Sequence, residues 1–495
     1  MIRINLQEAY GMKVPPLCTL QIDLDNFLYI QRTGKEQEEL NVRTVGRDLI
    51  SEVTEYLVAH YPKELQESFG NPSKKSKLRK IIAEYIPRNT NRLTKGFTLD
   101  ELTQELVNSI SGLDKFDAIL NEADENITDI VFNGSDIWIQ DNKKGFYKSK
   151  YRMTANEVEA IAKKVAYTTG KVWNYSKPEL DTELPNLRIN AIHPDISPYG
   201  TTMAIRVFSE KLRINEDSFV SSMGNQDILL LLKALIRSKA NIIITGDTGS
   251  GKTELLKFLV GFTQNNQRIN LLEDTLETNL KKLYPQKDIL MWRTRTSETD
   301  ETINVTFSRL IRSSLRVNPD WIIITETRGG EAYDMLKAAS TGHAVITTAH
   351  AKSAAQAPHR IVMMCQEQVD YRTEVLGKLT TSTFDIGIHL ELDPKTMTRR
   401  IASIVEYCDF EEDQAIIQPI FESEIVNIRE EAQASGEIIY VTEKEYHQKG
   451  TISEALANRM LQSGALQPEL LGLVPKKWAI QNNLLNTGIK EKVLA

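Results

Sequence analysis

Cysteine is scarce in this sequence. Three cysteines, Cys18, Cys365 and Cys408, occur in 495 residues, far apart and in no C-x-x-C pair. The chain alone can therefore build neither a disulfide framework nor a four-cysteine zinc site. Few cysteines without such spacing are typical of proteins from a reducing compartment.

Long hydrophobic runs are also missing. The sequence has no stretch of about 18 uncharged apolar residues, so we expect no transmembrane helix. Residues 1–8 lack the apolar segment of a signal peptide, which leads us to expect a cytoplasmic protein. The net charge of −7 argues against a surface that is committed as a whole to nucleic acid.

The clearest motif follows a short β-favouring segment. Residues 242–245 read Ile-Ile-Ile-Thr, and the next eight residues match the phosphate-binding pattern G-x-x-x-x-G-K-[ST] before helical spacing resumes. The loop amides and Lys252 would bind nucleotide phosphates, and the Thr253 hydroxyl would coordinate Mg²⁺. A chance glycine loop is the alternative. The eight residues are Gly246, Asp247, Thr248, Gly249, Ser250, Gly251, Lys252 and Thr253.

Three further β-favouring segments, at 268–272, 321–324 and 344–348, are followed by polar side chains. Alternating helices and strands over 225–422 predict an α/β domain with a parallel sheet. The carboxyl ends of such strands form the crevice in which these folds bind ligands. The side chains at the ends of the three segments are Glu273 and Asp274, then Glu326, and finally His350, with His343 leading into the third segment.

Residues 115–212 predict a separate α+β domain. A hairpin is expected over 127–139 around an Asn-Gly turn, and Thr154 with Glu157 fits a capping box at a helix start. Short strands punctuated by proline follow. The polar residues 213–224 are interpreted as a linker to the phosphate-loop domain.

The two ends of the chain are less informative. Residues 1–114 predict a variable, partly helical N-terminal extension, with helices at 49–57 and 99–110 and a basic run at 74–80. A solvated helix face is one interpretation of this run, and binding to anionic lipid or to an acidic partner is the other. We assign no chemistry to residues 423–495, which are interpreted as a C-terminal extension that could dock a partner.

Four motifs in order make the sequence resemble a known superfamily. They are G-D-T-G-S-G-K-T, E-D-T-x-E, N-P-D-W-I-I-I-T-E-T-R-G-G-E and T-G-H-A-V-I-T-T-A-H. The sequence is similar to the secretion ATPase superfamily of type II and type IV secretion, type IV pilus assembly and conjugation, and most similar to its tight-adherence pilus branch. The resemblance covers residues from about 120 to 420. It implies a RecA-like P-loop NTPase domain, preceded by an α+β N-terminal domain.

Two features depart from the family pattern. Thr325 precedes Glu326 where the family usually has glycine, which leaves the acid in place. The four-cysteine zinc module of the pilus-extension and type II branch cannot be built here, so that branch is not expected. Just beyond, Arg328 and Glu331 are expected to pair with each other at i, i+3 spacing.

The resemblance implies roles for the residues at the strand ends. Glu326 would orient or deprotonate the water that attacks the γ-phosphate. Glu273 and Asp274 would form the family's Asp box beside the metal and this water, and His343 and His350 would sense the γ-phosphate. Two alternatives stay open: Glu273 or Asp274 caps the next helix, and a strand-end histidine is a structural hydrogen-bonding group.

Arginines are a further question, because the charge on a transferring phosphoryl group is often stabilised by an arginine from another domain or subunit. Arg188 and Arg206, within residues 115–212, are candidates for such a catalytic finger, and Arg293 and Arg295 are others. For each of them a surface ion pair is an equally open interpretation.

The sequence therefore predicts an ATPase that uses ATP and Mg²⁺. The resemblance implies a cytoplasmic homo-hexamer, peripherally associated with the cytoplasmic membrane, which powers secretion, pilus assembly or conjugation through an inner-membrane platform protein. No direct contact with nucleic acid is expected. Two other functions stay open: a nucleic-acid translocase of a conjugation system, and a small-molecule kinase, for which neither an acceptor site nor a lid arginine pattern is seen.

Overall fold

The computed structural model of the chain describes residues 2–4, 18–23, 26–32, 45–89, 97–122, 126–295, 303–432 and 438–484. The chain divides into two compact units. One unit consists of residues 1–55 and 79–109, and the other consists of residues 56–78 and 110–495. No helix among the described residues is long and apolar enough to cross a membrane.

The first unit contains a small antiparallel sheet and helical segments. The sheet has the order β1-β2-β3, with strands Ile2–Ile4, Cys18–Asp23 and Asn26–Arg32. The helices that contribute to it are α2 (Arg47–His60), α4 (Pro72–Asn89) and α5 (Leu99–Ser111). The helices predicted at 49–57 and 99–110 are confirmed.

The start of α5 is fixed by a capping box. The backbone N–H of Thr98 donates to Glu101 Oε2 at 2.9 Å, and the N–H of Glu101 donates to Thr98 Oγ1 at 3.2 Å. Two N–H groups that have no acceptor inside the helix are thereby satisfied.

The basic run at 74–80 lies on α4, where acidic side chains pair with it. Its ion pairs are Lys74–Glu67 at 3.2 Å, Lys75–Asp117 at 2.5 Å, Lys77–Glu64 at 3.1 Å and Arg79–Asp100 at 2.6 Å. The exposed pairs among them each contribute about 0–1 kcal/mol to stability, whereas the Lys75–Asp117 pair is partly buried. Because these positive charges are partnered within the chain, the interpretation of the run as a helix face is favoured.

The second unit begins with α3 (Pro62–Ser68) and α6 (Lys115–Glu122) and then forms a six-stranded antiparallel sheet. The sheet order is β6-β5-β4-β9-β8-β7, and helix α7 (Ala155–Thr168) packs against it. The predicted hairpin is β4 with β5, and the predicted capping box of Thr154 and Glu157 is present. The strands are β4 (Ile127–Phe132), β5 (Ile137–Asp141), β6 (Gly145–Lys148), β7 (Glu179–Leu184), β8 (Leu187–Ile192) and β9 (Thr202–Val207).

One face of this sheet is buried and the other is not. In β8 the side chains of Leu187, Ile189 and Ala191 are buried, which is the alternation of a strand with one solvated face. The intervening Arg188 and, on the neighbouring strand β9, Arg206 therefore lie on the opposite face.

The segment interpreted as a linker, 213–224, contains two short helices. They are α8 (Glu216–Ser218) and the π-helix η1 (Phe219–Met223). Phe219 and Met223 are buried in the core of the following domain, and the Phe219 ring stacks on Phe258 with centroids 5.3 Å apart. The C-terminal part of this segment is therefore anchored to the phosphate-loop domain rather than free.

A nine-stranded sheet forms the phosphate-loop domain, in the order β12-β11-β13-β14-β10-β15-β16-β17-β18. The first six strands in this order are parallel, as predicted, and the last three are antiparallel. The parallel strands are β10 (Ile242–Gly246), β11 (Arg268–Glu273), β12 (Asp288–Arg293), β13 (Trp321–Ile324), β14 (Ala344–Ala349) and β15 (Ile386–Leu392). The antiparallel strands are β16 (Arg399–Glu411), β17 (Gln414–Ala432) and β18 (Ile438–Gln448).

Both faces of the sheet are buried beneath helices. On β10, Ile242 and Ile244 belong to one hydrophobic cluster and Ile243 belongs to the other, because successive side chains of a strand point to opposite faces. Burial on both faces explains why this strand is continuously apolar. The helices are α9 (Gln226–Arg237), α10 (Lys252–Gly261), α11 (Leu280–Leu283), α12 (Phe307–Ser314), α13 (Glu331–Ala339), α14 (Ala357–Gln366) and α15 (Thr373–Thr383).

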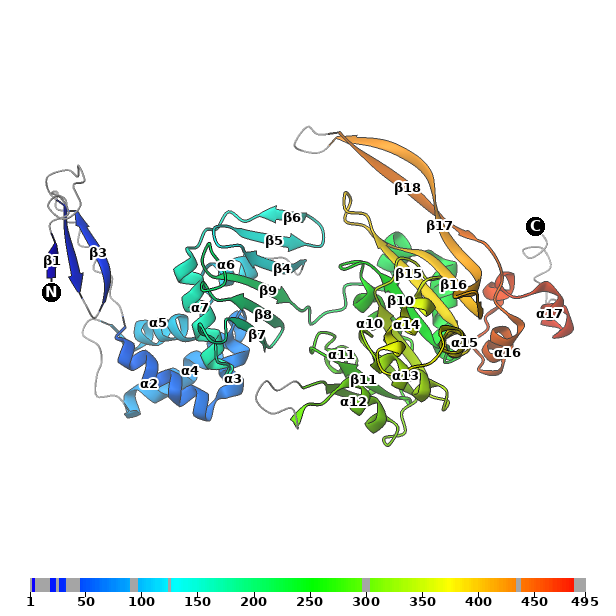
Figure 1. Cartoon of the computed structure of the whole chain (residues 1–495), viewed down its shortest axis with the longest axis horizontal. Helices are drawn as coiled ribbons and strands as arrows, with labels where there is room; N and C mark the ends of the chain where they lie inside the picture. The colour runs from blue at the N-terminus through cyan, green and yellow to red at the C-terminus, as the bar shows by residue number, and fades with distance from the viewer. Residues whose placement is uncertain are drawn as a thin grey trace. The chain divides into compact units, whose positions relative to one another are not determined.

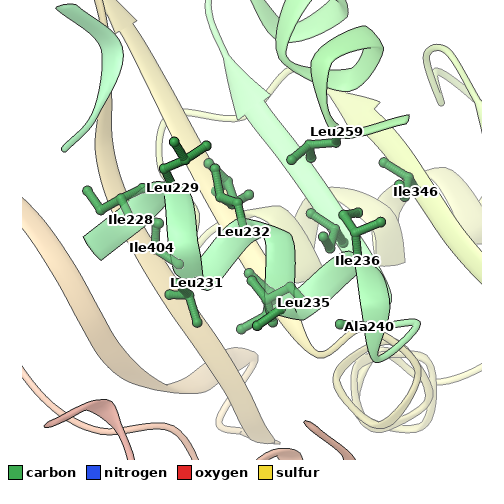
Figure 2. Packing of buried hydrophobic residues seen from close by; sticks show 14 of the residues in the cluster. Ile228, Leu229, Leu231, Leu232, Leu235, Ile236, Ala240, Leu259, Ile346 and Ile404 are labelled. Atoms are coloured by element: carbon green, nitrogen blue, oxygen red, sulfur yellow. The ribbon is translucent and has the colours of Figure 1, made fainter. Parts of the chain in front are cut away.

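Helix α9 shows how the sequence specifies one of these faces. Its side chains recur at helical spacing, and Figure 2 shows them packed beside Leu259, Ile346 and Ile404 of neighbouring elements. Each fully buried Leu or Ile contributes about 1.5–3 kcal/mol relative to an exposed one. The buried residues of α9 are Ile228, Leu229, Leu231, Leu232, Ala234, Leu235 and Ile236.

The C-terminal residues belong to the same fold as the sheet. The boundary predicted at 422 falls inside β17, and Figure 1 shows β17 and β18 (orange) as long neighbouring strands. The elements that follow are α16 (Glu454–Gln462), the 3₁₀ helix η3 (Pro468–Leu473) and α17 (Lys476–Gln481). Their side chains Leu456, Leu471 and Trp478 are buried in the cluster that also contains Ile242. The interpretation of 423–495 as a separate extension is therefore corrected, because its apolar residues complete the core of the phosphate-loop domain.

This correction predicts a large effect of a mutation far from the phosphate loop. Leu456→Ala should destabilise the phosphate-loop domain by about 2–5 kcal/mol, since it removes a side chain that is 3% exposed. Leu461→Ala, on the same helix but 37% exposed, is the matched control and should change little. Thermal unfolding of each variant, monitored through the loss of ATP binding, measures both effects. Equal melting temperatures for the two variants would show that α16 is an independent extension.

Candidate active site

The carboxyl ends of the parallel strands meet at one edge of the nine-stranded sheet. The register places Thr245 of β10 beside Ala349 of β14, and Leu272 of β11 beside Ile324 of β13. The residues at or just beyond these strand ends share this edge; they are Gly246, Glu273, Glu326 and His350.

Glycines give the phosphate loop its shape. Gly246, Gly249 and Gly251 have φ angles of 145°, 78° and 97°, in the region that residues with side chains rarely adopt. A Cβ atom on Gly246 would lie 2.4 Å from the carbonyl oxygen of Leu390, so only glycine fits there. Asp247, Thr248 and Gly249 are exposed along the loop, whereas Ser250 and Lys252 are buried.

The donors of the loop are bonded to the loop itself. Lys252 Nζ donates to the carbonyl oxygens of Gly246 and Asp247 at 2.8 and 2.9 Å, and the N–H of Ser250 donates to Asp247 O at 3.2 Å. Burial lowers the pKa of Lys252, against the opposing effect of Glu326 and Asp247. Phosphate oxygens are stronger, charged acceptors for the same donors.

The loop also has hydrogen-bonding groups that are available to a phosphate. The buried Ser250 hydroxyl has no hydrogen-bond partner among the described residues. Helix α10 begins at Lys252, so the N–H groups of its first turn have no acceptors within the helix. These groups provide the converging donors that a nucleotide phosphate requires.

Thr253 and Asp274 are the residues expected to coordinate Mg²⁺. Thr253 lies half-buried in the first turn of α10, and Asp274 is exposed just after β11, where it accepts a hydrogen bond from Thr294 Oγ1. Hydroxyl and carboxylate oxygens are ligands that Mg²⁺ prefers. Within the described ranges no group of three or more His, Cys, Asp or Glu side chains could hold a metal. Mg²⁺ in nucleotide sites usually keeps several water ligands and binds through one or two protein groups and the phosphates, and the oxygens of Thr253 and Asp274 are of the kind it takes.

Glu326 lies between Arg328 and His350. Arg328 Nη2 donates to its Oε2 at 2.6 Å, and His350 Nε2 lies 3.3 Å from its Oε1. Burial acts to raise the pKa of Glu326, but Arg328, His350 and Lys252 outweigh it, so that this pKa lies below its usual value. The carboxyl group is therefore ionised at neutral pH, as a group that orients or deprotonates water must be.

The predicted pair of Arg328 with Glu331 is wrong. Arg328 bonds to Glu326, whereas Glu331 Oε1 accepts the backbone N–H groups of Arg328 and Gly329 at 2.8 and 3.0 Å. Helix α13 begins only at Glu331, so Arg328 lies outside it and the i, i+3 spacing of a helix does not apply. Glu331 instead satisfies the free N–H groups before the helix.

Glu273 is bonded to the loop that follows its own strand. Its side chain is fully buried, and Oε1 accepts the N–H groups of Glu277 and Thr278 at 3.2 and 3.0 Å. Burial raises its pKa to about 7. The role of Glu273 at the metal and water stays a prediction: its Oε1 braces the loop that follows β11, close to the capping alternative, while its Oε2 has no hydrogen-bond partner among the described residues. The neighbouring Asp274 is exposed.

The two histidines lie at opposite ends of β14. His343 precedes the strand and its Nδ1 lies 3.0 Å from Thr341 Oγ1, whereas His350 follows the strand. Seven residue steps of an extended strand separate them by roughly 23 Å. Within one chain, His343 therefore cannot sense the same phosphate as His350, because it lies at the edge of the sheet remote from the phosphate loop.

Arg188 and Arg206 face each other across β8 and β9. Like charges at such a position repel, and here each is paired with a carboxylate. Arg206 Nε donates to Asp129 at 2.9 Å, while Nε and Nη2 of Arg188 donate to Asp181 at 3.1 and 2.8 Å. Arg188 Nη1 also donates to Thr275 Oγ1 at 3.1 Å, in the loop after Asp274. Arg188 thus reaches the phosphate-loop domain, and a catalytic role of either arginine stays a prediction.

The other two candidate arginines are used in different contacts. Arg293 Nη1 donates to Glu183 Oε2 at 3.1 Å, and Arg295 Nε donates to the carbonyl oxygen of Ile303 at 2.9 Å. One residue beside the phosphate loop was not predicted at all: Arg399, whose Nε donates to the carbonyl oxygen of Gly249 at 2.8 Å. No sequence motif marks it, since it lies 150 residues beyond that glycine and meets it only through sheet pairing.

Comparisons with known proteins show which chains this one is similar to. The model of a family described as type II/IV secretion system protein matches residues 119–386. An uncharacterised protein of Bacillus anthracis is 28% identical over 380 residues, which are 74% of this chain and 82% of that protein. The type IV secretion system protein VirB11 of Brucella suis biovar 1 is 30% identical over 217 residues, which are 43% of this chain and 60% of that protein. The solved structure of the Legionella pneumophila ATPase DotB matches with a TM-score of 0.40 and 17% identity, over 72% of this chain and 92% of that one.

The placement of the histidines predicts different effects of the same substitution. His350→Ala should lower ATP turnover by on the order of tenfold or more, because it removes a partner of Glu326 beside the site of hydrolysis. His343→Ala is the matched control and should retain turnover within about threefold, as expected of a surface substitution. Steady-state hydrolysis at saturating ATP measures both. A loss in His343→Ala as large as in His350→Ala would show that His343 acts on the nucleotide, through a neighbouring subunit.

Proposed function

Since this chain belongs to the type II/IV secretion system protein family, we propose that it is a ring-forming, Mg²⁺-dependent ATPase that drives a secretion, pilus-assembly or conjugation machine. The family match spans more than half of the chain, and the chain is an ATPase on that ground. The observation that carries the proposal is the convergence of the phosphate loop, Glu326 and His350 at one sheet edge.

In the proposed mechanism the nucleotide replaces the internal bonds of the loop. Lys252 moves from the carbonyl oxygens of Gly246 and Asp247 to the β- and γ-phosphates, and the loop amides bind the remaining oxygens. Bound Mg²⁺ would neutralise charge on the phosphates, with Thr253 and Asp274 as its protein ligands. Glu326, fixed by the end of β13, holds the attacking water in line and accepts its proton.

Ring formation is the second part of the proposal. A site that needs an arginine from a neighbouring copy favours head-to-tail contacts, and such contacts form a ring when the rotation closes. Arg206 is the preferred candidate for such a finger, because it lies on the exposed face of the β4–β9 sheet and is half-exposed itself. In one chain it is held by Asp129, a pair that a neighbour's phosphates could replace. A hexamer is the proposed ring size, from the family resemblance.

The place of action is likewise proposed from the family. We assign the ring to the cytoplasmic face of the membrane, bound to a platform protein of the machine, with the tight-adherence pilus branch as its nearest group. A nucleic-acid translocase is the competing function. A DNA-binding titration at low salt tests it, since affinity that falls steeply with salt would favour the translocase.

Two substitutions should separate catalysis from nucleotide binding. Glu326→Gln keeps the size of the side chain but removes the base, so ATP should bind within about tenfold of the parent affinity while turnover falls on the order of 10²-fold or more. Lys252→Ala removes the positive charge that would contact the phosphates. It should therefore weaken ATP binding before it affects the hydrolysis step. Nucleotide titration and steady-state hydrolysis measure the two effects. If Glu326→Gln lost affinity and rate together, its assignment to the water would be wrong.

Mixing two kinds of inactive subunit tests whether Arg206 acts on the nucleotide of a neighbouring subunit. Arg206→Ala subunits and Lys252→Ala subunits should each be inactive alone, and their mixture should regain part of the turnover if Arg206 acts on a neighbour's nucleotide. The parent's specific activity should also rise with protein concentration as rings form. The absence of recovery would assign Arg206 to its own subunit, and a flat concentration dependence with a monomeric mass would contradict the ring.

A further inference from the structure

The hairpin between β15 and β16 lies beside the phosphate loop, and its residue Arg399 makes an unusual set of contacts. Its Nε donates to the carbonyl oxygen of Gly249 at 2.8 Å. Its Nη2 donates to Asn142 Oδ1 at 2.7 Å, and Nη1 lies 3.4 Å from Asn142 O and 3.2 Å from Met397 O. One side chain thus joins the phosphate loop to the turn between β5 and β6, and all of these residues belong to the same compact unit.

Among the described residues, every acceptor of Arg399 is a neutral oxygen. Most of the arginines described above, such as Arg188, Arg206 and Arg328, are paired with carboxylates, whereas the half-buried guanidinium of Arg399 bonds only to carbonyl and amide oxygens. Burial lowers the pKa of Arg399, nearby Arg213 lowers it further, and the more distant charge of Glu254, which is not bonded to it, opposes both. Burying a guanidinium without a bonded carboxylate costs free energy. We therefore infer that Arg399 fixes the conformation of the loop rather than neutralising a charge.

The bond to Gly249 acts on the part of the loop that meets phosphate. A peptide group is planar, so its C=O and the following N–H point in opposite directions. By holding the Gly249 carbonyl on the outside of the loop, Arg399 turns the N–H of Ser250 inward, where it now bonds to Asp247 O. Gly249 has no Cβ atom and a φ of 78°, so its backbone restricts the orientation of this peptide less than other residues would.

A second contact between the same hairpin and the same turn supports the link. The backbone of Met397 is left-handed, with a φ of 56°, a conformation that costs roughly 1 kcal/mol for a residue with a side chain. Met397 presents its carbonyl oxygen to Arg399, and a Cβ atom on Gly145, at the start of β6, would lie 3.5 Å from Met397 Sδ. Contacts at both Asn142 and Gly145 thus position the hairpin tip against the β5–β6 turn.

We propose that Arg399 is a positioning residue that couples nucleotide binding at the phosphate loop to the β5–β6 turn of the N-terminal α+β sheet. It holds the Gly249–Ser250 peptide in the orientation that phosphate needs, and it does so only while Asn142 holds the guanidinium. Nucleotide binding and the seating of the turn therefore stabilise each other, since coupling between two sites is reciprocal. This inference rests on the nucleotide site proposed above.

The test compares full-length variants by ATP titration and by hydrogen–deuterium exchange of residues 141–146. In the parent, saturating ATP with Mg²⁺ should slow exchange in this turn. Arg399→Gln should weaken ATP binding by about fivefold or more, raise KM more than it lowers kcat, and abolish the response of the turn even at saturating ATP. Arg399→Lys should fail to restore the response, because one ammonium group cannot reach Gly249 and Asn142 together.

Two further variants make the outcome decisive. Arg400→Gln removes the same charge from the same strand, one residue away and without a bond to the phosphate loop, and should behave as the parent. Asn142→Ala should weaken ATP binding as Arg399→Gln does and should abolish the response of the turn at saturating ATP, and it decides the question alone if Arg399→Gln does not fold. A turn that still responds to ATP in Arg399→Gln or in Asn142→Ala overturns the coupling. A parent that binds no ATP would instead contradict the proposed function.

Discussion

The parallel pairing of β10 with β14, and of β14 with β13, is the constraint on which the rest of the site depends. Parallel strands present all of their carboxyl ends at one edge, so residues that are 80 or more positions apart in the chain meet there. The pairing is maintained by side chains such as Ile243 and Ile323, which are buried in the clusters on the two faces of the sheet. A change that shifted one of these strands by a single residue would exchange its faces and displace the polar residue that follows it.

The charges at this edge are balanced before nucleotide arrives. Lys252 is bonded to carbonyl oxygens of its own loop, and Glu326 is held by Arg328 and His350. A bound γ-phosphate would compete with Glu326 for these groups, since phosphate oxygens and carboxylate oxygens attract the same donors. We interpret this arrangement as a site in which nucleotide frees the carboxylate for water while phosphate takes over its partners.

The antiparallel half of the nine-stranded sheet connects the site to distant parts of the chain. Through β15 and β16 it brings Arg399 to the phosphate loop, and through β17 and β18 it leads to helices whose side chains complete the core under β10. The family model matches residues 119–386, so Arg399 and the antiparallel strands lie outside that match, and the features described for them come from this structure alone. The coupling proposed for Arg399 would be one of them.

The sequence by itself determined the parts of the site that depend on local geometry. A phosphate loop is made by consecutive residues, so the glycines and Lys252 could be read directly, as could the capping boxes at Thr98 and Thr154 and the strand that leads to Glu326. Only the tertiary structure decided which side chains reach the crevice. Glu273 and Asp274 are neighbours in the chain, yet one is buried and the other exposed. His343 and His350 share a motif but lie at opposite ends of a strand, and Arg399 reaches Gly249 through strand pairing that no motif records. The reason is physical. A short motif fixes the backbone conformation over a few residues, whereas the burial of a side chain, the face of the sheet on which it lies and its ion pairs depend on contacts with residues far away in the sequence.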